Sequence, residues 1–229
     1  MTVHPTTSVK IKICCMQSVE EAALAVRCGA DAVGLVSAMP SGPGPIAEEL
    51  IATIARRVPP GVATFLLTSR RDATAIADQV RRLGPTTVQI VDRPEPGCWA
   101  SLRSALPSTT LVQVVHVTGP AALDEAMAAA PHVDALLLDS GNPSLPVKEL
   151  GGTGRTHDWL TSRRIREASH VPVWLAGGLT PENVAEAIET VRPFGVDVCS
   201  GVRTGGMLDE GKLARFVAEV RRTGLQTAV

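Results

Sequence analysis

VPVWLAGGLTPENVAEAIETVRPFGVDVCSGVR, residues 171–203, is the stretch that decides the fold. Two short apolar runs rich in β-branched residues, at 171–175 and 196–199, predict buried strands, and each is followed by small residues. Between them, Thr180 and Pro181 predict the N-cap and the first turn of a helix. One glycine pair after a strand is ordinary turn chemistry. Small residues after two successive strands favour a phosphate site, because backbone N–H groups can approach an anion closely there.

Strand-like and helix-like segments alternate along the whole chain. The strands are predicted at 9–15, 32–36, 62–67, 87–91, 111–117, 135–138, 171–175 and 196–199, and the helices at 19–28, 46–57, 72–83, 98–106, 120–130, 158–168, from 180 onward and at 209–222. Parallel strands joined by right-handed crossovers close at eight into a (β/α)₈ TIM barrel, and an open doubly wound sheet is the alternative. We expect residues 1–229 to form one barrel domain, with residues 1–8 as a flexible N-terminal tail.

The composition argues against several classes of protein. A net charge of −1 gives no electrostatic case for nucleic acid or for an anionic membrane, and the absence of tyrosine leaves few rings for base stacking. No run of 18 apolar residues predicts a transmembrane span, and the first residues lack the pattern of a signal peptide. Five cysteines at irregular spacings, with no CxxC pair, argue against a disulfide framework or a zinc site. We therefore expect a cytoplasmic protein with reduced thiols.

Two residues at strand ends are candidates for catalysis, because chemistry in a barrel belongs at the C-terminal ends of the strands. Cys14 lies near the end of the first strand, although a cysteine in an apolar strand is usually a core residue. Cys14 and Cys15 should point to opposite sides of the strand, so that only one of them faces the barrel interior. Asp139 closes the apolar sixth strand and is either a general acid or base or a cap for the next loop.

Other polar positions give weaker indications of a functional role. The long loop at 140–156 contains GGTG at 151–154 and is a mobile lid, a ligand cradle or simply a flexible connection. Asp197 lies within the eighth strand, and we expect it to be structural and paired inside the barrel. His116, near the end of the fifth strand, is expected to pack rather than to bind a ligand.

Eight short motifs follow one another along the chain. They are KIC at 12–14, GADAVG at 29–34, VQ at 88–89, LLD at 137–139, GGTG at 151–154 followed by DW at 158–159, LAGGL at 175–179, PENV at 181–184 and VDVCSGV at 196–202. Through these motifs the chain resembles the phosphoribosylanthranilate isomerase family of the tryptophan pathway over nearly its whole length. The resemblance implies the barrel already predicted and an Amadori rearrangement of an aminoaldose phosphate to an aminoketose phosphate. It implies neither a metal nor an organic cofactor.

The resemblance also implies roles for individual residues. Asp139 matches the general acid that opens the ribose ring, and Cys14 matches the general base that removes the C2′ proton, for which the thiol must become a thiolate. The implied phosphate-binding positions are Gly152, Gly154, Gly177, Gly178, Ser200 and Gly201. The expected partner is a small phosphosugar, and the expected assembly is a monomer or a homodimer.

Four positions depart from the pattern of that family. Cys15 stands where the family usually has glycine, and residues 39–45 lack the arginine that holds the anthranilate carboxylate in the family. Strand four ends in QIVD at 89–92 instead of QLHG, and Arg203 replaces an acid. The candidates to replace the missing arginine are Arg70, Arg93 and Arg203. Two alternatives therefore stand beside the isomerase: the same acid–base pair acting on a different phosphosugar, and a catalytically silent phosphosugar-binding barrel.

Overall fold

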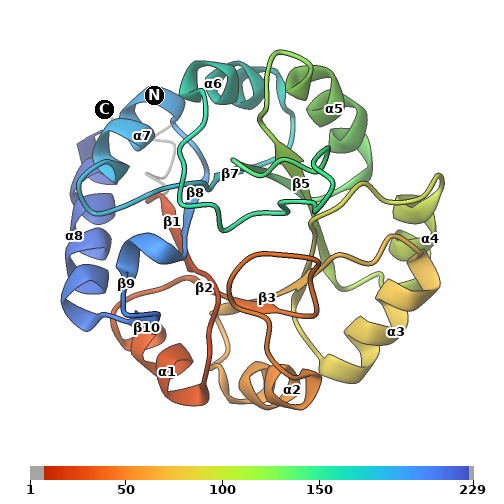
Figure 1. Ribbon diagram of the computed structural model, residues 1–229, viewed down its shortest axis with the longest axis horizontal. Helices are drawn as coiled ribbons and strands as arrows, with labels where there is room; N and C mark the ends of the chain where they lie inside the picture. Colours follow the sequence, from red (N-terminus) through yellow and green to blue (C-terminus); the bar gives the residue numbers. More distant parts are fainter. Residues whose placement is uncertain (1–7, 227–229) are drawn as a thin grey trace, which may run out of the picture.

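Residues 8–226, the part of the chain that this computed structural model describes, form a closed barrel of eight parallel strands surrounded by helices (Figure 1). The strands follow one another around the barrel in sequence order, and the last pairs with the first. The predicted (β/α)₈ barrel is confirmed, and closure rules out the open sheet. Apart from Ser8, the expected tail at 1–8 lies outside the described residues. No helix in the described part of the chain is both long and apolar enough to span a membrane.

The elements occupy the following residues. The barrel strands are β1 Lys10–Ile13, β2 Ala32–Val36, β3 Ala63–Thr68, β4 Thr87–Ile90, β5 Thr110–His116, β6 Ala135–Asp139, β7 Val173–Leu175 and β8 Gly195–Val198. The helices are α1 Val19–Arg27, α2 Glu48–Arg57, α3 Ala73–Leu83, α4 Cys98–Ala105, α5 Ala122–Ala129, α6 Trp159–Ala168, α7 Val184–Val191 and α8 Glu210–Gln226. Two 3₁₀ turns, η1 Ala130–His132 and η2 Ser200–Val202, and a hairpin of β9 Arg203–Thr204 and β10 Met207–Leu208 complete the set.

Strands β1 and β8 close the barrel. Lys12 lies opposite Asp197, and Ile13 lies opposite Val198. Successive side chains of a strand point to opposite faces. Ile11 and Ile13 therefore pack outward against the helices, whereas Lys12 and Asp197 point into the barrel. The closing pair of strands thus brings two charged side chains into the interior.

Aromatic side chains fill the interior below this level. The rings of Phe65 and Trp174 meet edge to face, with centroids 5.6 Å apart. Trp174 covers Gly195, where an added Cβ would lie only 2.5 Å from the indole ring. The barrel interior therefore has an apolar floor, and the cavity described below opens toward the C-terminal ends of the strands.

The start of α7 differs from the prediction. Thr180 is not the N-cap; the helix begins at Val184 with Asn183 at the N-cap position. The Asn183 side chain accepts a hydrogen bond from Thr180 N at 2.8 Å and donates one to the Gly178 carbonyl at 2.9 Å. Because these bonds hold residues 180–183 in a turn, the glycine turn after β7 is fastened to the helix that follows it.

The β9–β10 hairpin was not predicted from the sequence. Thr204 pairs with Met207, and the turn between them is formed by Gly205 and Gly206, with φ of 58° and 82°. Two consecutive positive φ angles suit a tight hairpin turn, and glycine adopts them without strain. The hairpin lies near α1 and the start of α8 (Figure 1) and carries Arg203 at its base.

Candidate active site

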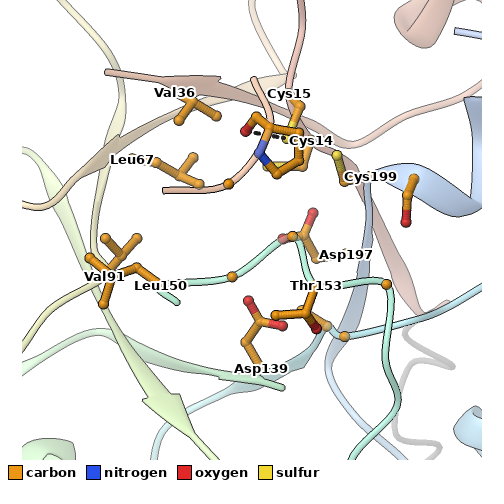
Figure 2. Close-up of a pocket in the computed structure, with 18 of the residues that line it drawn as sticks. Cys14, Cys15, Val36, Leu67, Val91, Asp139, Leu150, Thr153, Asp197 and Cys199 are labelled. Carbon is orange, nitrogen blue, oxygen red and sulfur yellow. Dashed lines mark hydrogen bonds between the residues drawn. The ribbon is translucent and has the colours of Figure 1, made fainter. Parts of the chain in front are cut away.

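A cavity of about 690 Å³, counting its open mouth, lies at the C-terminal ends of the barrel strands. Figure 2 shows that the residues lining the cavity form a polar end and an apolar end. One end has the polar groups, Cys14, Cys15, Cys199, Asp139 and Asp197; the other has Val36, Leu67, Val91 and Leu150. Active sites of TIM-barrel enzymes lie at this face of the fold.

Asp139 extends from the end of β6 into the cavity. Its Oδ1 accepts a hydrogen bond from the Ser140 backbone N–H at 2.7 Å. Its Oδ2 faces Gly151, where an added Cβ would lie 2.5 Å from the oxygen. No described residue donates a hydrogen bond to Oδ2, so one carboxyl oxygen is anchored and the other is available to a ligand.

Lys12 and Asp197 form an ion pair beneath the polar end. Lys12 Nζ lies 2.7 Å from Asp197 Oδ2, and the two side chains are only 0% and 7% exposed. Burial alone would lower the pKa of Lys12, but the charges of Asp197 and of the nearby cysteine sulfurs outweigh burial and raise it. Lys12 therefore stays protonated. The expected structural pairing of Asp197 inside the barrel is confirmed.

Cys14 lies directly above this ammonium group. An added Cβ on Gly34 of β2 would lie 2.6 Å from Cys14 Sγ and 3.2 Å from Lys12 Nζ, so both atoms approach the same point. Cysteine acts as a base or a nucleophile in its thiolate form. Gly34 leaves the space that this close approach needs.

Cys14 and Cys15 both line the cavity, so the expectation that only one of them faces the interior is wrong. The reason is that β1 ends at Ile13, and strand alternation ends with it. Cys15 has φ of 64°, a left-handed conformation that residues with a Cβ rarely adopt. Arg203 Nη2 donates a hydrogen bond to the Cys15 carbonyl at 2.5 Å and holds this turn in place.

Glycine turns after β7 and β8 bring backbone close to the cavity. Gly178 has φ of 62°, and an added Cβ would lie 2.5 Å from the Arg155 backbone. An added Cβ on Gly201 would lie 2.0 Å from the Leu179 carbonyl oxygen. Neither position has room for a side chain. The predicted phosphate-binding residues that line the cavity are Gly152, Gly154, Gly177, Gly178 and Ser200, and Gly201 packs behind them.

Two long loops meet over the cavity. The loop after β2 contributes Ser41, whose hydroxyl donates a hydrogen bond to the Lys148 carbonyl in the loop after β6. Pro43 packs on Gly152, where an added Cβ would lie 2.5 Å from the proline ring. Through these contacts the loop after β2 and the loop after β6 together cover the cavity.

The three arginines proposed for the aglycone do not line the cavity. Arg203 is 9% exposed and donates to both Glu21 carboxyl oxygens, at 2.8 and 3.0 Å. Arg93 is exposed, and its backbone N–H donates to Asp92. Arg70 is 48% exposed, and its ion-pair contact is a distant 3.9 Å to Glu48. Among the described residues lining the cavity, none is Arg or Lys.

Two neighbours of the site were missed in the sequence. Glu21 falls three residues after the N-cap Ser18 and looks like an ordinary capping-box acid, yet its carboxylate binds Arg203 from the other end of the chain. His157 lies close to Gly177, and burial lowers its pKa despite the opposing charge of Asp139. Neither contact could be read from local sequence, because each depends on how distant loops meet.

Comparison with known proteins gives the family. The model described as N-(5'phosphoribosyl)anthranilate (PRA) isomerase matches residues 11–219. The chain belongs to the PRA isomerase family. N-(5'-phosphoribosyl)anthranilate isomerase 2 of Methanosarcina mazei is 39% identical over 91% of this chain and 92% of its own length. The Haloarcula marismortui N-(5'-phosphoribosyl)anthranilate isomerase is 39% identical over 93% of this chain and 96% of its own length.

Solved structures of PRA isomerases have the same architecture. The enzyme from Thermotoga maritima superposes with a TM-score of 0.79 at 30% identity, covering 93% of this chain and 99% of that one. A phosphoribosyl anthranilate isomerase structure in complex with reduced 1-(o-carboxyphenylamino)-1-deoxyribulose 5-phosphate superposes with a TM-score of 0.76 at 28% identity, covering 93% of this chain and 99% of that one. Fold and family agree that this chain is an isomerase.

The Lys12–Asp197 pair predicts a specific loss of stability. In Asp197→Asn, the fully buried ammonium of Lys12 would lose its counter-charge, and we expect the free energy of unfolding to fall by about 3–5 kcal/mol. The control is the double variant Lys12→Met/Asp197→Leu, which removes both charges and should recover most of the loss. Urea unfolding followed by circular dichroism measures both. An Asp197→Asn protein within about 1 kcal/mol of wild type would mean that the pair is dispensable.

Proposed function

We propose that this chain converts N-(5′-phosphoribosyl)anthranilate into 1-(o-carboxyphenylamino)-1-deoxyribulose 5-phosphate by an Amadori rearrangement. The observation that carries the proposal is the pairing of Cys14 and Asp139 in one cavity, between glycine turns at one end and apolar side chains at the other. A substrate with a phosphate, a sugar and an aromatic ring matches this order of surfaces. Family membership supports the same reaction.

Asp139 is the proposed general acid. Protonation of the ribose ring oxygen breaks the C1′–O bond and leaves a Schiff base between C1′ and the anthranilate nitrogen. The acid must present a proton from an oxygen that no protein donor occupies, and Asp139 Oδ2 meets that condition. Ser140 N–H fixes the other oxygen and so the direction in which the proton is delivered.

Cys14 is the proposed general base. A thiolate there removes the proton from C2′, which is acidic because it neighbours the iminium carbon, and the resulting enolamine tautomerises to the ketone. The Lys12 ammonium faces this sulfur and offsets its negative charge. Protons balance, because Asp139 gives one to the ring oxygen and Cys14 takes one from carbon.

The two ends of the cavity divide the work of binding. The backbone at Gly177, Gly178 and Ser200, with Gly152 and Gly154 opposite, is the proposed phosphate site. The apolar end, with Leu67 and Val91, is the proposed site of the aromatic ring. The solved relative in complex with the reduced carboxyphenylamino sugar phosphate supports a ligand of this shape.

A second candidate keeps the acid–base pair and changes the aglycone. It is favoured by one observation: neither lysine nor arginine is present among the described residues that line the cavity. An anthranilate carboxylate would then need a cation from the rim. We propose Arg70 for this task, because it follows β3 next to the apolar end and its guanidinium makes only the 3.9 Å contact with Glu48 among the described residues. Arg93 and Arg203 are the other candidates.

The acid–base assignment predicts the behaviour of two variants. Cys14→Ala removes the base and Asp139→Asn removes the acid, and we expect each to lower kcat by about 10²–10⁴-fold with the fold intact. The measurement is the loss of substrate fluorescence when phosphoribosylanthranilate is generated in situ. Cys98→Ser, a buried cysteine on α4 outside the cavity, is the control and should keep wild-type turnover. If folded wild type shows no turnover, the substrate is wrong and other aminoaldose phosphates should be screened.

The proposed carboxylate contact predicts an effect on KM. Arg70→Ala should raise KM for phosphoribosylanthranilate by about tenfold and leave kcat nearly unchanged, because a uniform binding contact is lost. Arg93→Ala serves as the matched exposed arginine and should change KM less. Arg203→Ala is expected to act differently, through Glu21 and the Cys15 turn. An unchanged KM in all three variants would eliminate these arginines as carboxylate ligands.

A further inference from the structure

The turn that follows Cys14 is held in an unfavourable backbone conformation. Cys15 has φ of 64°, and among residues 8–226 the only other residue with a Cβ and a positive φ is Arg192, at the C-cap of α7. A residue with a Cβ persists in the left-handed region only where surrounding contacts hold it there. The contacts around Cys15 therefore do more than fill space, because they keep this turn from relaxing.

The chain is fixed on both sides of Cys15. The Cys14 N–H donates a hydrogen bond to the Val198 carbonyl of β8 at 2.8 Å. The Met16 N–H donates one to the Gly34 carbonyl of β2 at 3.0 Å. If Cys15 relaxed to a negative φ, the peptide between Cys14 and Cys15 would therefore have to rotate. An added Cβ on Gly34 would lie 2.6 Å from Cys14 Sγ and 3.1 Å from Cys14 Cα, so the sulfur is seated against Gly34 and such a rotation would displace it.

The guanidinium of Arg203 connects this turn to α1. Its Nη2 donates to the Cys15 carbonyl at 2.5 Å and to Glu21 Oε2 at 2.8 Å. Its Nη1 donates to Glu21 Oε1 at 3.0 Å and to the Gly206 carbonyl of the β9–β10 hairpin at 2.8 Å. A guanidinium that binds both oxygens of one carboxylate has a fixed direction. The hydrogen bond to the Cys15 carbonyl therefore comes from a donor that is itself held in place.

Glu21 fixes the other side of the guanidinium. Its carboxylate also accepts hydrogen bonds from the Gln17 N–H at 3.0 Å and from the Leu208 N–H at 2.9 Å. Burial alone would raise the pKa of Glu21, but the hydrogen bonds from Arg203 and from these two backbone groups outweigh burial and lower it. Glu21 therefore stays ionised, and its pair with Arg203 is shielded from water, since the two side chains are only 7% and 9% exposed.

We propose that Arg203 and Glu21 are positioning residues for Cys14. By holding the Cys15 carbonyl, their ion pair maintains the left-handed turn and so keeps the Cys14 sulfur in its place in the cavity. Neither Arg203 nor Glu21 lines the cavity, so both act through the turn and not on the substrate. The inference rests on the proposed function of Cys14 as the base that removes the C2′ proton.

The proposal predicts that Arg203 and Cys15 are energetically coupled. Arg203→Ala should lower kcat for phosphoribosylanthranilate by about 10–100-fold, because a small displacement of the base is costly, and should change KM less than about twofold. Cys15→Gly removes the strain, because glycine accepts φ of 64°. In that background Arg203→Ala should therefore lower kcat by less than about threefold. Loss by the same factor in both backgrounds would mean that Arg203 serves the fold alone, and would overturn the proposal.

Two further variants complete the kinetic test. Arg221→Ala is the matched control, because Arg221 also binds a carboxylate and a backbone carbonyl, those of Asp31 at 2.8 Å and Val9 at 2.9 Å, but at the N-terminal end of β1. It should keep wild-type kcat. Glu21→Gln removes the charge that holds Arg203 and should reproduce both the loss of kcat and its suppression by Cys15→Gly. This variant provides the test if Arg203→Ala does not fold, and wild-type kcat in Glu21→Gln would overturn the proposal.

Crystal structures of the variants separate this proposal from the proposed function. In Arg203→Ala we expect a negative φ at Cys15 and a Cys14 sulfur displaced by about 1 Å, whereas Cys15→Gly/Arg203→Ala should keep the wild-type turn. An unchanged turn in Arg203→Ala would overturn the positioning role even if wild type turns over. A relaxed turn, together with a wild type that does not turn over phosphoribosylanthranilate, would support the positioning of Cys14 and reject the proposed substrate.

Discussion

The buried ion pair of Lys12 and Asp197 is the interaction on which the site depends. It joins β1 to β8 where the barrel closes, and each charge needs the other because both are buried. Cys14 lies two residues after Lys12, and Cys199 two residues after Asp197. Closing the barrel therefore brings both cysteines to the lining of one cavity, so that fold and site are assembled by one contact between strands.

The remainder of the cavity is built around that fixed point. Asp139 approaches from β6 with one oxygen anchored, and glycine turns after β7 and β8 expose backbone where side chains have no room. The apolar side chains of Val36 on β2, Leu67 on β3 and Val91 just after β4 lie at the far end. Under the proposed function, an anion and an aromatic ring would bind at opposite ends, and the reacting carbons would lie between acid and base. Rigid strand ends suit this arrangement better than mobile loops.

The sequence was enough to predict the barrel, because its eight alternating segments follow elementary patterns of burial and turn chemistry. The positions of Cys14 and Asp139 at the ends of predicted strands also made them candidates for catalysis. What the sequence could not give depends on long-range contacts. The Asn183 side chain delays the start of α7, Cys15 turns into the cavity after β1 has ended, and Glu21 occupies Arg203 from the opposite end of the chain. Local propensity contains no information on any of these three.

The most direct test of this account is a crystal structure of the full chain with reduced 1-(o-carboxyphenylamino)-1-deoxyribulose 5-phosphate bound. The account predicts the phosphate on the backbone of Gly177, Gly178 and Ser200, the ring against Leu67 and Val91, and the sugar carbons between the Cys14 sulfur and the Asp139 carboxylate. A ligand bound with its phosphate elsewhere, or with its sugar beyond the reach of both residues, would contradict it.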